Sequence, residues 1–221
     1  MDRRLFIGAA ALGLGLGGPV FAQDAGVAPV GPDDLVLGSP KAPVTVIEYA
    51  SASCPHCARF NNEVFPAFKA KYIDTGQVYY AFREFLTPPV EFAAAAFLIA
   101  RCAGKDKYFT VLDGVFQAQA EIYQSGDLHG PMLKIAQAAG LDEKAVDACL
   151  ADTKAIEALN ARMQQYLSRD KVSSTPTFVV NGARLVGEQT LAALDTAIAA
   201  AEAKAKAKPQ GHPARRRHPH A

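Results

Sequence analysis

Residues 44–57 read VTVIEYASASCPHC, an apolar, β-branched run followed by two cysteines with two residues between them. The run is apolar on both faces, which predicts a buried β-strand. Proline is favoured at the first position of a helix, so Pro55 places Cys54 at the N-cap and Cys57 one turn further along. The stretch therefore predicts a strand-to-helix junction that carries two sulfur atoms on one face of the helix.

The segments around this junction predict an α/β fold. After the first strand we expect a helix, a strand, a block of helices, a hairpin and a final helix, at residues 55–72, 77–85, 91–171, 177–186 and 190–206. Pro66 predicts a kink in the first helix, and Asn181-Gly182 is typical of a two-residue hairpin turn. The first strand, helix and second strand can form a parallel βαβ unit. The hairpin completes a mixed central sheet, and the helical block packs against that sheet as a subdomain.

The first 22 residues are typical of a cleaved signal peptide. Arg3 and Arg4 precede the uncharged run Leu5–Gly18, which is shorter than the roughly 20 residues that span a membrane. Small residues then suit cleavage after Ala22. The arginine pair also resembles a twin-arginine export signal, with an ordinary charged n-region as the alternative. Either route leads to an oxidising compartment where disulfides persist, so we expect a periplasmic protein.

The charge balance argues against a nucleic-acid-binding protein. The chain has 23 Lys and Arg against 22 Asp and Glu, and the part between the signal and the arginine-rich tail is slightly acidic, whereas phosphate binding requires a basic face. We divide the chain into a signal peptide, a linker, the first part of the sheet domain, a helical insertion, the second part of the sheet domain and a disordered basic tail, at residues 1–22, 23–34, 35–85, 86–172, 173–207 and 208–221.

Cys54 and Cys57 predict a redox-active pair. A thiolate at the N-cap can accept hydrogen bonds from the free N–H groups of the first helical turn, and it faces the positive end of the helix dipole. These interactions, together with His56, lower the pKa of the Cys54 thiol below its free value of ~8.5. A stabilised thiolate favours the reduced state, so the closed disulfide becomes a stronger oxidant. Cys57 is expected to be less exposed and to act as the resolving thiol.

Metal binding is the main alternative for this motif. Cys54 and Cys57, with His56 as a third ligand, could form part of a zinc or copper site. Structural zinc usually needs four ligands, and Cys102 and Cys149 do not form a second C-x-x-C. We therefore expect no metal, and no cofactor, because the cysteine pair is itself the redox centre.

Two stretches resemble the DsbA-type thiol:disulfide interchange proteins of the thioredoxin-like superfamily. Residues 42–57 carry the strand and the Pro55-His56 dipeptide within C-x-x-C, and Thr175-Pro176-Thr177-Phe178 resembles the family's cis-proline loop. The resemblance covers roughly residues 35–207 and implies a thioredoxin-like α/β fold with an inserted all-helical subdomain. It implies that Cys54 is the attacking cysteine, with Cys57 as its buried partner. It also implies that Pro176 faces them in a cis bond that exposes the Thr175 backbone to a substrate strand.

Glu48 matches a buried acid beneath the active site of this family. It lies in an otherwise apolar strand, where an ionised carboxylate is costly unless it is paired. Glu48 could shuttle the proton of Cys57, or it could be a structural carboxylate paired with an arginine such as Arg83.

Cys102 and Cys149 fall among apolar residues of the predicted helical block. In an exported protein we expect them to form a structural disulfide. Closing a loop of this length stabilises a protein by at most ~4 kcal/mol in the chain-entropy treatment. Two buried free thiols are the alternative.

The sequence thus predicts a periplasmic thiol:disulfide oxidoreductase that oxidises cysteine pairs in exported proteins. Its expected substrates are reduced exported polypeptides, and the resemblance implies a membrane oxidase of the DsbB type that reoxidises it. One alternative is a disulfide reductase or isomerase on the same fold, because Thr175 stands where enterobacterial DsbA has Val. The short stretch before the fold leaves no room for the isomerases' dimerisation domain, so we expect a monomer. A periplasmic metal carrier is a second alternative.

Overall fold

The computed structural model describes residues 26–207, so the predicted signal peptide and basic tail lie outside the described residues. The elements are, in chain order, β1 Leu35–Leu37, β2 Val44–Ala50, α1 Pro55–Arg59, the π-helical turn η1 Phe60–Val64, α2 Phe65–Phe68, the π-helical turn η2 Lys69–Ile73, β3 Val78–Glu84, α3 Val90–Cys102, α4 Lys105–Ser125, α5 His129–Ala138, α6 Glu143–Leu150, α7 Thr153–Ser168, β4 Thr177–Val180, β5 Ala183–Val186 and α8 Leu191–Ala207.

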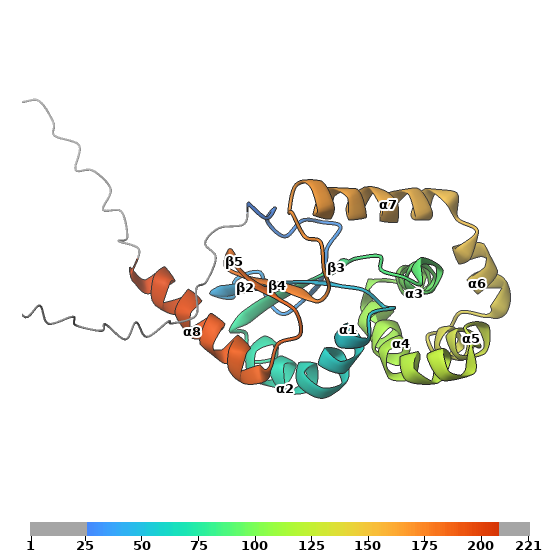
Figure 1. The fold of residues 1–221 in the computed structure, drawn as a ribbon, viewed down its shortest axis with the longest axis horizontal. Coiled ribbons are helices and arrows are strands. Elements are labelled where there is room, and N and C mark those ends of the chain that lie inside the picture. The colour runs from blue at the N-terminus through green and yellow to red at the C-terminus, as the bar shows by residue number, and fades with distance from the viewer. Residues whose placement is uncertain (1–25, 208–221) are drawn as a thin grey trace, which may run out of the picture.

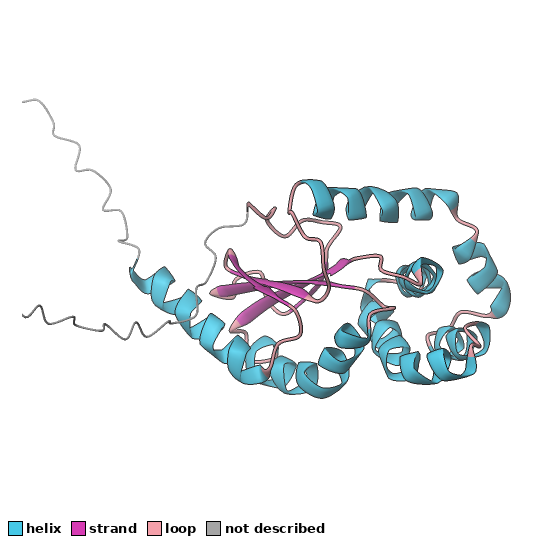
Figure 2. Cartoon of the chain, in the orientation of Figure 1, coloured by secondary structure: helices cyan, strands magenta, loops and turns pink. Residues whose placement is uncertain are grey.

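The five strands form one mixed sheet in the order β1-β3-β2-β4-β5. Figure 2 draws this sheet in magenta between the helices. β2 and β3 are parallel and the other pairs are antiparallel. The predicted βαβ unit, hairpin and mixed sheet are therefore confirmed. β1 was not predicted, because three residues are too few to show the alternation of a strand.

Helices cover both faces of the sheet, and α2 and α8 lie opposite α7 (Figure 1). Side chains of β2 alternate between the faces. Val46 packs in the larger core together with Phe60 and Ile198, whereas Ile47 and Tyr49 pack on the other face in a smaller core of Tyr166, Val172 and Val179. This alternation decides which side chains of β2 and β3 reach the cysteine pair.

The first helix is irregular where proline interrupts it. The helix changes from α to π geometry over η1, directly before Pro66, which lies in the first turn of α2. Proline has no amide hydrogen and disrupts the regular hydrogen-bond ladder. The predicted kink is thus a local change of helix type in a segment that continues to Ile73.

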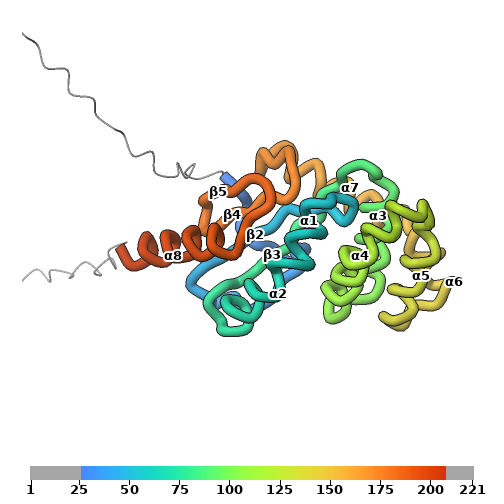
Figure 3. The backbone as a smooth tube through the Cα atoms, turned by 60° about the horizontal axis from the view of Figure 1, so that its bottom comes forward, coloured from blue at the N-terminus to red at the C-terminus, as the bar shows by residue number. Residues whose placement is uncertain are grey.

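Helices α3 to α7 occupy the predicted insertion, and α3, α4, α5 and α6 group at one end of the molecule (Figure 3). Cys102 at the end of α3 and Cys149 in α6 are joined by a disulfide, with Cα atoms 6.1 Å apart. None of the helices in the described part of the chain is both long and apolar enough to span a bilayer.

The described part of the predicted linker is packed against the sheet domain. The guanidinium of Arg83 donates to the carbonyl oxygens of Ala28 and Pro29 and forms an ion pair with Asp34 at 2.9 Å. The amide of Ala28 donates to Asp170. Residues 26–34 thus form a strap that two buried charged side chains hold in place.

Candidate active site

Cys54 lies at the junction that the sequence predicts, between β2 and α1. It is the N-cap residue, in an extended conformation, and Pro55 begins the helix. Its amide donates to the carbonyl of Ser51 at 3.1 Å. Both cysteines are free thiols, and Cys57 is completely buried whereas Cys54 is 8% exposed. The site is therefore a dithiol of which only Cys54 reaches the surface.

The helical insertion holds this junction through side chains of α4. The amide of Gln119 donates to the carbonyl oxygens of Ala52 at 2.7 Å and Cys54 at 3.2 Å. The hydroxyl of Tyr123 donates to the carbonyl of Ser53. Three successive carbonyl groups before or at the reactive cysteine are thus fixed by two side chains that the sequence analysis did not identify.

The two thiols have opposite acidities. A hydrogen bond from the Cys57 thiol is the largest cause that lowers the pKa of Cys54, to about 5, with smaller contributions from Thr175 and from the amides of Cys57 and His56. Burial, followed by the neighbouring Cys54, raises the pKa of Cys57 well above its usual value. At neutral pH the pair therefore consists of a thiolate on Cys54 and a protonated Cys57.

The main cause of the lowered pKa of Cys54 differs from the one that the sequence suggests, which was the start of the helix together with His56. The side chain of Cys54 makes no capping hydrogen bond of ordinary length with the helix, so the amides contribute less than its partner thiol does. Of His56, only the backbone amide is among the groups that lower the pKa of Cys54; Nδ1 of its imidazole lies 3.0 Å from the carboxylate of Glu188. Local sequence did not indicate the hydrogen bond from the Cys57 thiol to Cys54, because that bond depends on side-chain packing. It also did not indicate the contact of His56 with Glu188, which is 132 residues away.

The loop before β4 lies against Cys54. The Thr175-Pro176 bond is cis, and the Cys54 thiol donates to the Thr175 carbonyl at 3.5 Å. The loop reaches this place because β4 pairs with β2, with Thr177 opposite Tyr49. A second cis bond, Pro88-Pro89, follows β3. The loop that begins at β3 also contacts the junction, since Ser53 donates to the carbonyl of Thr87 at 2.7 Å.

Glu48 is a buried acid on the cysteine side of the sheet. It is 3% exposed and accepts a hydrogen bond from the hydroxyl of Tyr80 at 2.6 Å. The pKa of Glu48 is raised to about 8, mainly by burial; the hydrogen bond from Tyr80 opposes this rise, and the charge of Cys54 adds a smaller contribution to it. A carboxyl with this pKa exchanges its proton near neutral pH.

The alternative partner, Arg83, does not pair with Glu48. In the β2–β3 register Glu48 lies opposite Phe82, and Arg83 lies opposite Tyr49. Neighbouring residues of a strand point to opposite faces, so Arg83 reaches Asp34 and Asp170 on the other side of the sheet. The structural pairing proposed for Glu48 is therefore absent, and Tyr80 takes that place.

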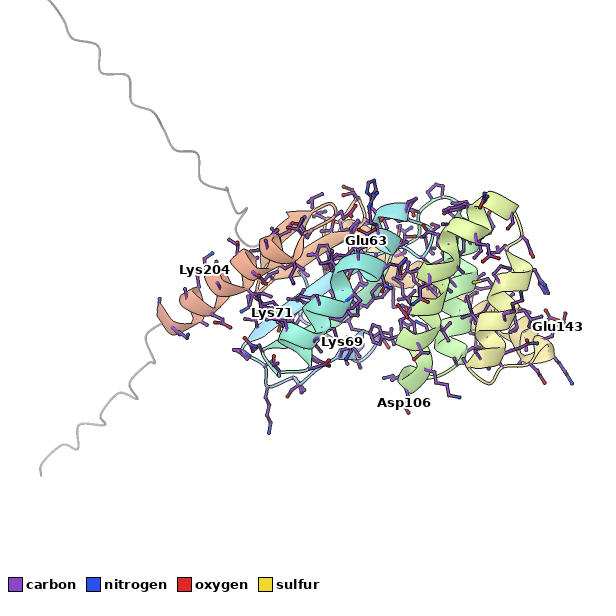
Figure 4. All side chains as sticks on the ribbon, turned by 90° about the horizontal axis from the view of Figure 1, so that it is seen from below. Glu63, Lys69, Lys71, Asp106, Glu143 and Lys204 are labelled. Carbon is purple, nitrogen blue, oxygen red and sulfur yellow. A yellow bond between two sulfur atoms is a disulfide. The ribbon has the colours of Figure 1, made fainter. Side chains whose placement is uncertain are left out.

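Glu48 also borders a cavity of about 580 Å³ between the first helix, α4 and the sheet. Tyr80 lines it beside Glu48, and polar side chains of both helices line it further out, among them Asn61 and Asp113. Lys69 and Asp106, which Figure 4 labels, belong to the same lining. The buried acid thus influences Cys57 on the one hand and lines a cavity with several polar side chains on the other.

The described residues 26–207 contain no ligand set of the kind that the metal-binding alternative requires. No three or more His, Cys, Asp and Glu side chains lie together there in a way that could hold a metal ion. His56, Cys54 and Cys57 are therefore not arranged as a ligand group, although they are neighbours in sequence.

A C-x-x-C at the start of a helix, facing a cis-proline on a mixed sheet, defines a thioredoxin-type dithiol site. The sequence model of the family described as Thioredoxin matches residues 31–200. A protein of Rickettsia conorii named as a protein-disulfide oxidoreductase is 34% identical over 80% of this chain and 64% of its own length. The chain thus spans a little under two thirds of that relative.

Solved structures agree with this assignment. Alpha-DsbA1 of Wolbachia pipientis superposes with a TM-score of 0.72 and 30% identity, over 80% of this chain and 94% of that one. BdbD of Bacillus subtilis, at 21% identity and a TM-score of 0.65 over 83% of this chain and 98% of that one, shares the fold. The chain therefore belongs to the thioredoxin family, as a DsbA-type member, which confirms the resemblance seen in the sequence.

Proposed function

We propose that this protein is a thiol:disulfide oxidoreductase that introduces disulfides into exported polypeptides. The observation that carries the proposal is the opposite acidity of the two thiols, with the pKa of Cys54 lowered to about 5 and that of Cys57 raised. A stabilised Cys54 thiolate makes the reduced site the preferred one, so the closed disulfide withdraws electrons from a substrate.

The exchange runs in two balanced steps. A substrate thiolate attacks the Cys54 sulfur of the closed disulfide, and the Cys54–Cys57 bond breaks as the mixed disulfide forms. Cys57 leaves as a thiolate and takes up a proton. A second substrate thiolate attacks the substrate sulfur of the mixed disulfide, which releases Cys54 as a thiolate. The substrate loses two electrons and two protons; the protein gains the two electrons and the proton on Cys57, and the second proton goes to solvent because Cys54 stays a thiolate.

Glu48 is the group that supplies the proton to Cys57 in this scheme. Its charge contributes to the raised pKa of Cys57, which requires that the two side chains interact. With a pKa of about 8, Glu48 is mostly protonated at neutral pH and can donate. The cavity that it borders, whose lining includes the polar side chains of Asn61 and Asp113, offers a route for its own reprotonation from solvent.

The proposal includes a location and partners. We place the protein in the periplasm after cleavage near Ala22, with reduced exported polypeptides as substrates and a membrane oxidase of the DsbB type as the electron acceptor. The support is the charged and apolar pattern at the start of the chain and the similarity to DsbA-type proteins. Amino-terminal sequencing of the protein purified from the periplasm tests the cleavage, which predicts Gln23 as the first residue.

The redox equilibrium with glutathione tests the oxidase role. We expect a reduction potential well above the roughly −270 mV of thioredoxin, and a value below about −250 mV would contradict the proposal. Titration of the Cys54 thiolate absorbance provides an independent check, with an expected midpoint of about 5.

An isomerase role is the second candidate, and Thr175 favours it. The Thr175 side chain stabilises the Cys54 thiolate by a hydrogen bond, which changes how readily a mixed disulfide is released. Refolding of a scrambled substrate separates the roles: an oxidase forms disulfides in the reduced substrate but recovers little activity from the scrambled one.

A further inference from the structure

The loop between β5 and α8 contacts both halves of the dithiol site, which are the cis-proline segment Thr175-Pro176 and helix α1 with Cys54 at its start. The amide of Gly187 donates to the carbonyl of Pro176 at 2.9 Å. The next residue, Glu188, accepts from Nε of Arg59 with both carboxylate oxygens at 2.9 Å, and its Oε2 lies 3.0 Å from Nδ1 of His56. One loop thus holds the cis-proline segment through its backbone and α1 through its side chain.

The Glu188 contact persists in either protonation state of His56. Nδ1 of His56 lies 2.7 Å from Nη2 of Arg59 as well as 3.0 Å from Glu188. A neutral Nδ1 accepts from Arg59, whereas a protonated Nδ1 donates to Glu188. Arg59 remains charged in both states, so its two bonds keep the Glu188 carboxylate attached to α1. Charge-assisted bonds of this kind are stronger than neutral ones, although this pair is exposed.

Few other contacts join the two halves near the surface. The last residue pair of the β2–β4 ladder is Tyr49 with Thr177, so the ladder does not include the cis-proline residues Thr175 and Pro176. Below the surface the rings of Phe60 and Phe178 pack with centroids 4.7 Å apart. At the surface Sγ of Cys54 also contacts Thr175, whose carbonyl oxygen lies 3.5 Å away, and this contact changes when Cys54 reacts.

We propose that Glu188 is a positioning residue for peptide thiols, which holds α1 and Cys54 at a fixed separation from the backbone of Thr175 and Pro176. The inference rests on the proposed function, in which a substrate strand lies along Thr175 while its sulfur attacks Cys54. A peptide must meet both halves at once, so its reaction depends on their separation. A small thiol such as glutathione needs only the sulfur of Cys54.

The test compares two thiols on the same variant. In Glu188→Gln we expect the rate constant for oxidation of a dithiol peptide to fall about fivefold, the effect that one partly exposed ion pair can supply. The rate constant with glutathione should change less than twofold. Glu63→Gln is the matched control, because Glu63 is an exposed carboxylate of η1, labelled in Figure 4, and forms no ion pair among the described residues. It should affect neither rate constant.

A double-mutant cycle shows whether the contact acts as a unit. Arg59→Gln should lower the peptide rate as Glu188→Gln does, and the double variant should lose no more than either single one. Additive losses, equal losses with both thiols, or no loss in Glu188→Gln would each overturn the inference while leaving the oxidase proposal intact. A wild-type protein that is inert toward both thiols would overturn the proposed function and this inference together.

Discussion

Cys54 and Cys57 lie at the start of one helix, whereas Cys102 and Cys149 join two helices across 47 residues. In the first pair the two sulfur atoms are not bonded to each other, and that of Cys54 is stabilised as an anion by Cys57 and by Thr175. The second pair is closed, with Cys149 buried in the helical insertion and Cys102 exposed. The same residue type therefore serves two purposes, and the groups around each sulfur decide which.

The largest expected effect concerns the exposed sulfur. Cys54→Ser should lower oxidation of a dithiol peptide by roughly a thousandfold or more, because serine cannot form the mixed disulfide. Cys57→Ser, incubated with a peptide that carries a disulfide, should instead accumulate the mixed disulfide, because its Cys54 thiolate attacks the peptide disulfide, releases one peptide thiolate and has no partner thiol to displace it; mass spectrometry detects the mass of the bound peptide. Equal accumulation of the mixed disulfide in Cys54→Ser and Cys57→Ser would mean that the two sulfurs are not distinguished as the structure indicates.

Removal of the second pair should affect stability. The variant Cys102→Ala with Cys149→Ala should lose up to about 4 kcal/mol of unfolding free energy, the chain-entropy value for a loop of this length. Urea unfolding without reductant measures the loss. The pKa of Cys54 is the control, and a changed value would show that the two pairs are not independent.

Glu48, which lies near the open pair and not near the closed one, should make the stability of the protein depend on pH. Its folded pKa of about 8 lies above its usual value of 4.5, so its contribution to stability is fully present below pH 4.5 and is lost as the pH rises through 8. Glu48→Gln removes this loss. The variant should be more stable than the wild type at pH 9, by on the order of 2 kcal/mol, and no more stable at pH 4. The same pH dependence of the unfolding free energy in the wild type and in Glu48→Gln would contradict a raised pKa for the buried Glu48.

Tyr80→Phe should produce the smallest effect. The hydroxyl of Tyr80 stabilises the ionised form of Glu48, so its removal should raise the pKa of Glu48 by roughly one further unit. Infrared titration of the carboxyl band, with Glu48→Gln to assign that band, measures the shift. A lower pKa in Tyr80→Phe would show that the hydroxyl does not donate to this carboxylate.

Local features of the sequence were sufficient for the junction, the hairpin and the mixed sheet. Pro55 fixes the helix start next to Cys54, and Asn181-Gly182 fixes the turn, and both depend only on neighbouring residues. The same reasoning placed Glu48 in a buried strand. It named Arg83 as a possible partner and did not identify Tyr80, because the partner of Glu48 depends on strand register.

The features that sequence reasoning missed are all contacts between distant segments. Gln119, Tyr123 and Glu188 reach the cysteine pair from α4 and from the loop after β5, and no spacing or composition signals them. β1 is too short to show alternation. The main cause of the lowered pKa of Cys54 was also assigned to the helix, because the orientation of the Cys57 thiol is a matter of packing.

The bonds from α4 to the segment before the reactive cysteine matter for anyone who wishes to build a minimal redox scaffold from this chain. Trimming the insertion would leave the carbonyl oxygens of Ala52, Ser53 and Cys54 without the donors that Gln119 and Tyr123 provide. A shortened version would therefore need two replacement donors, grafted onto whatever closes the gap between β3 and β4.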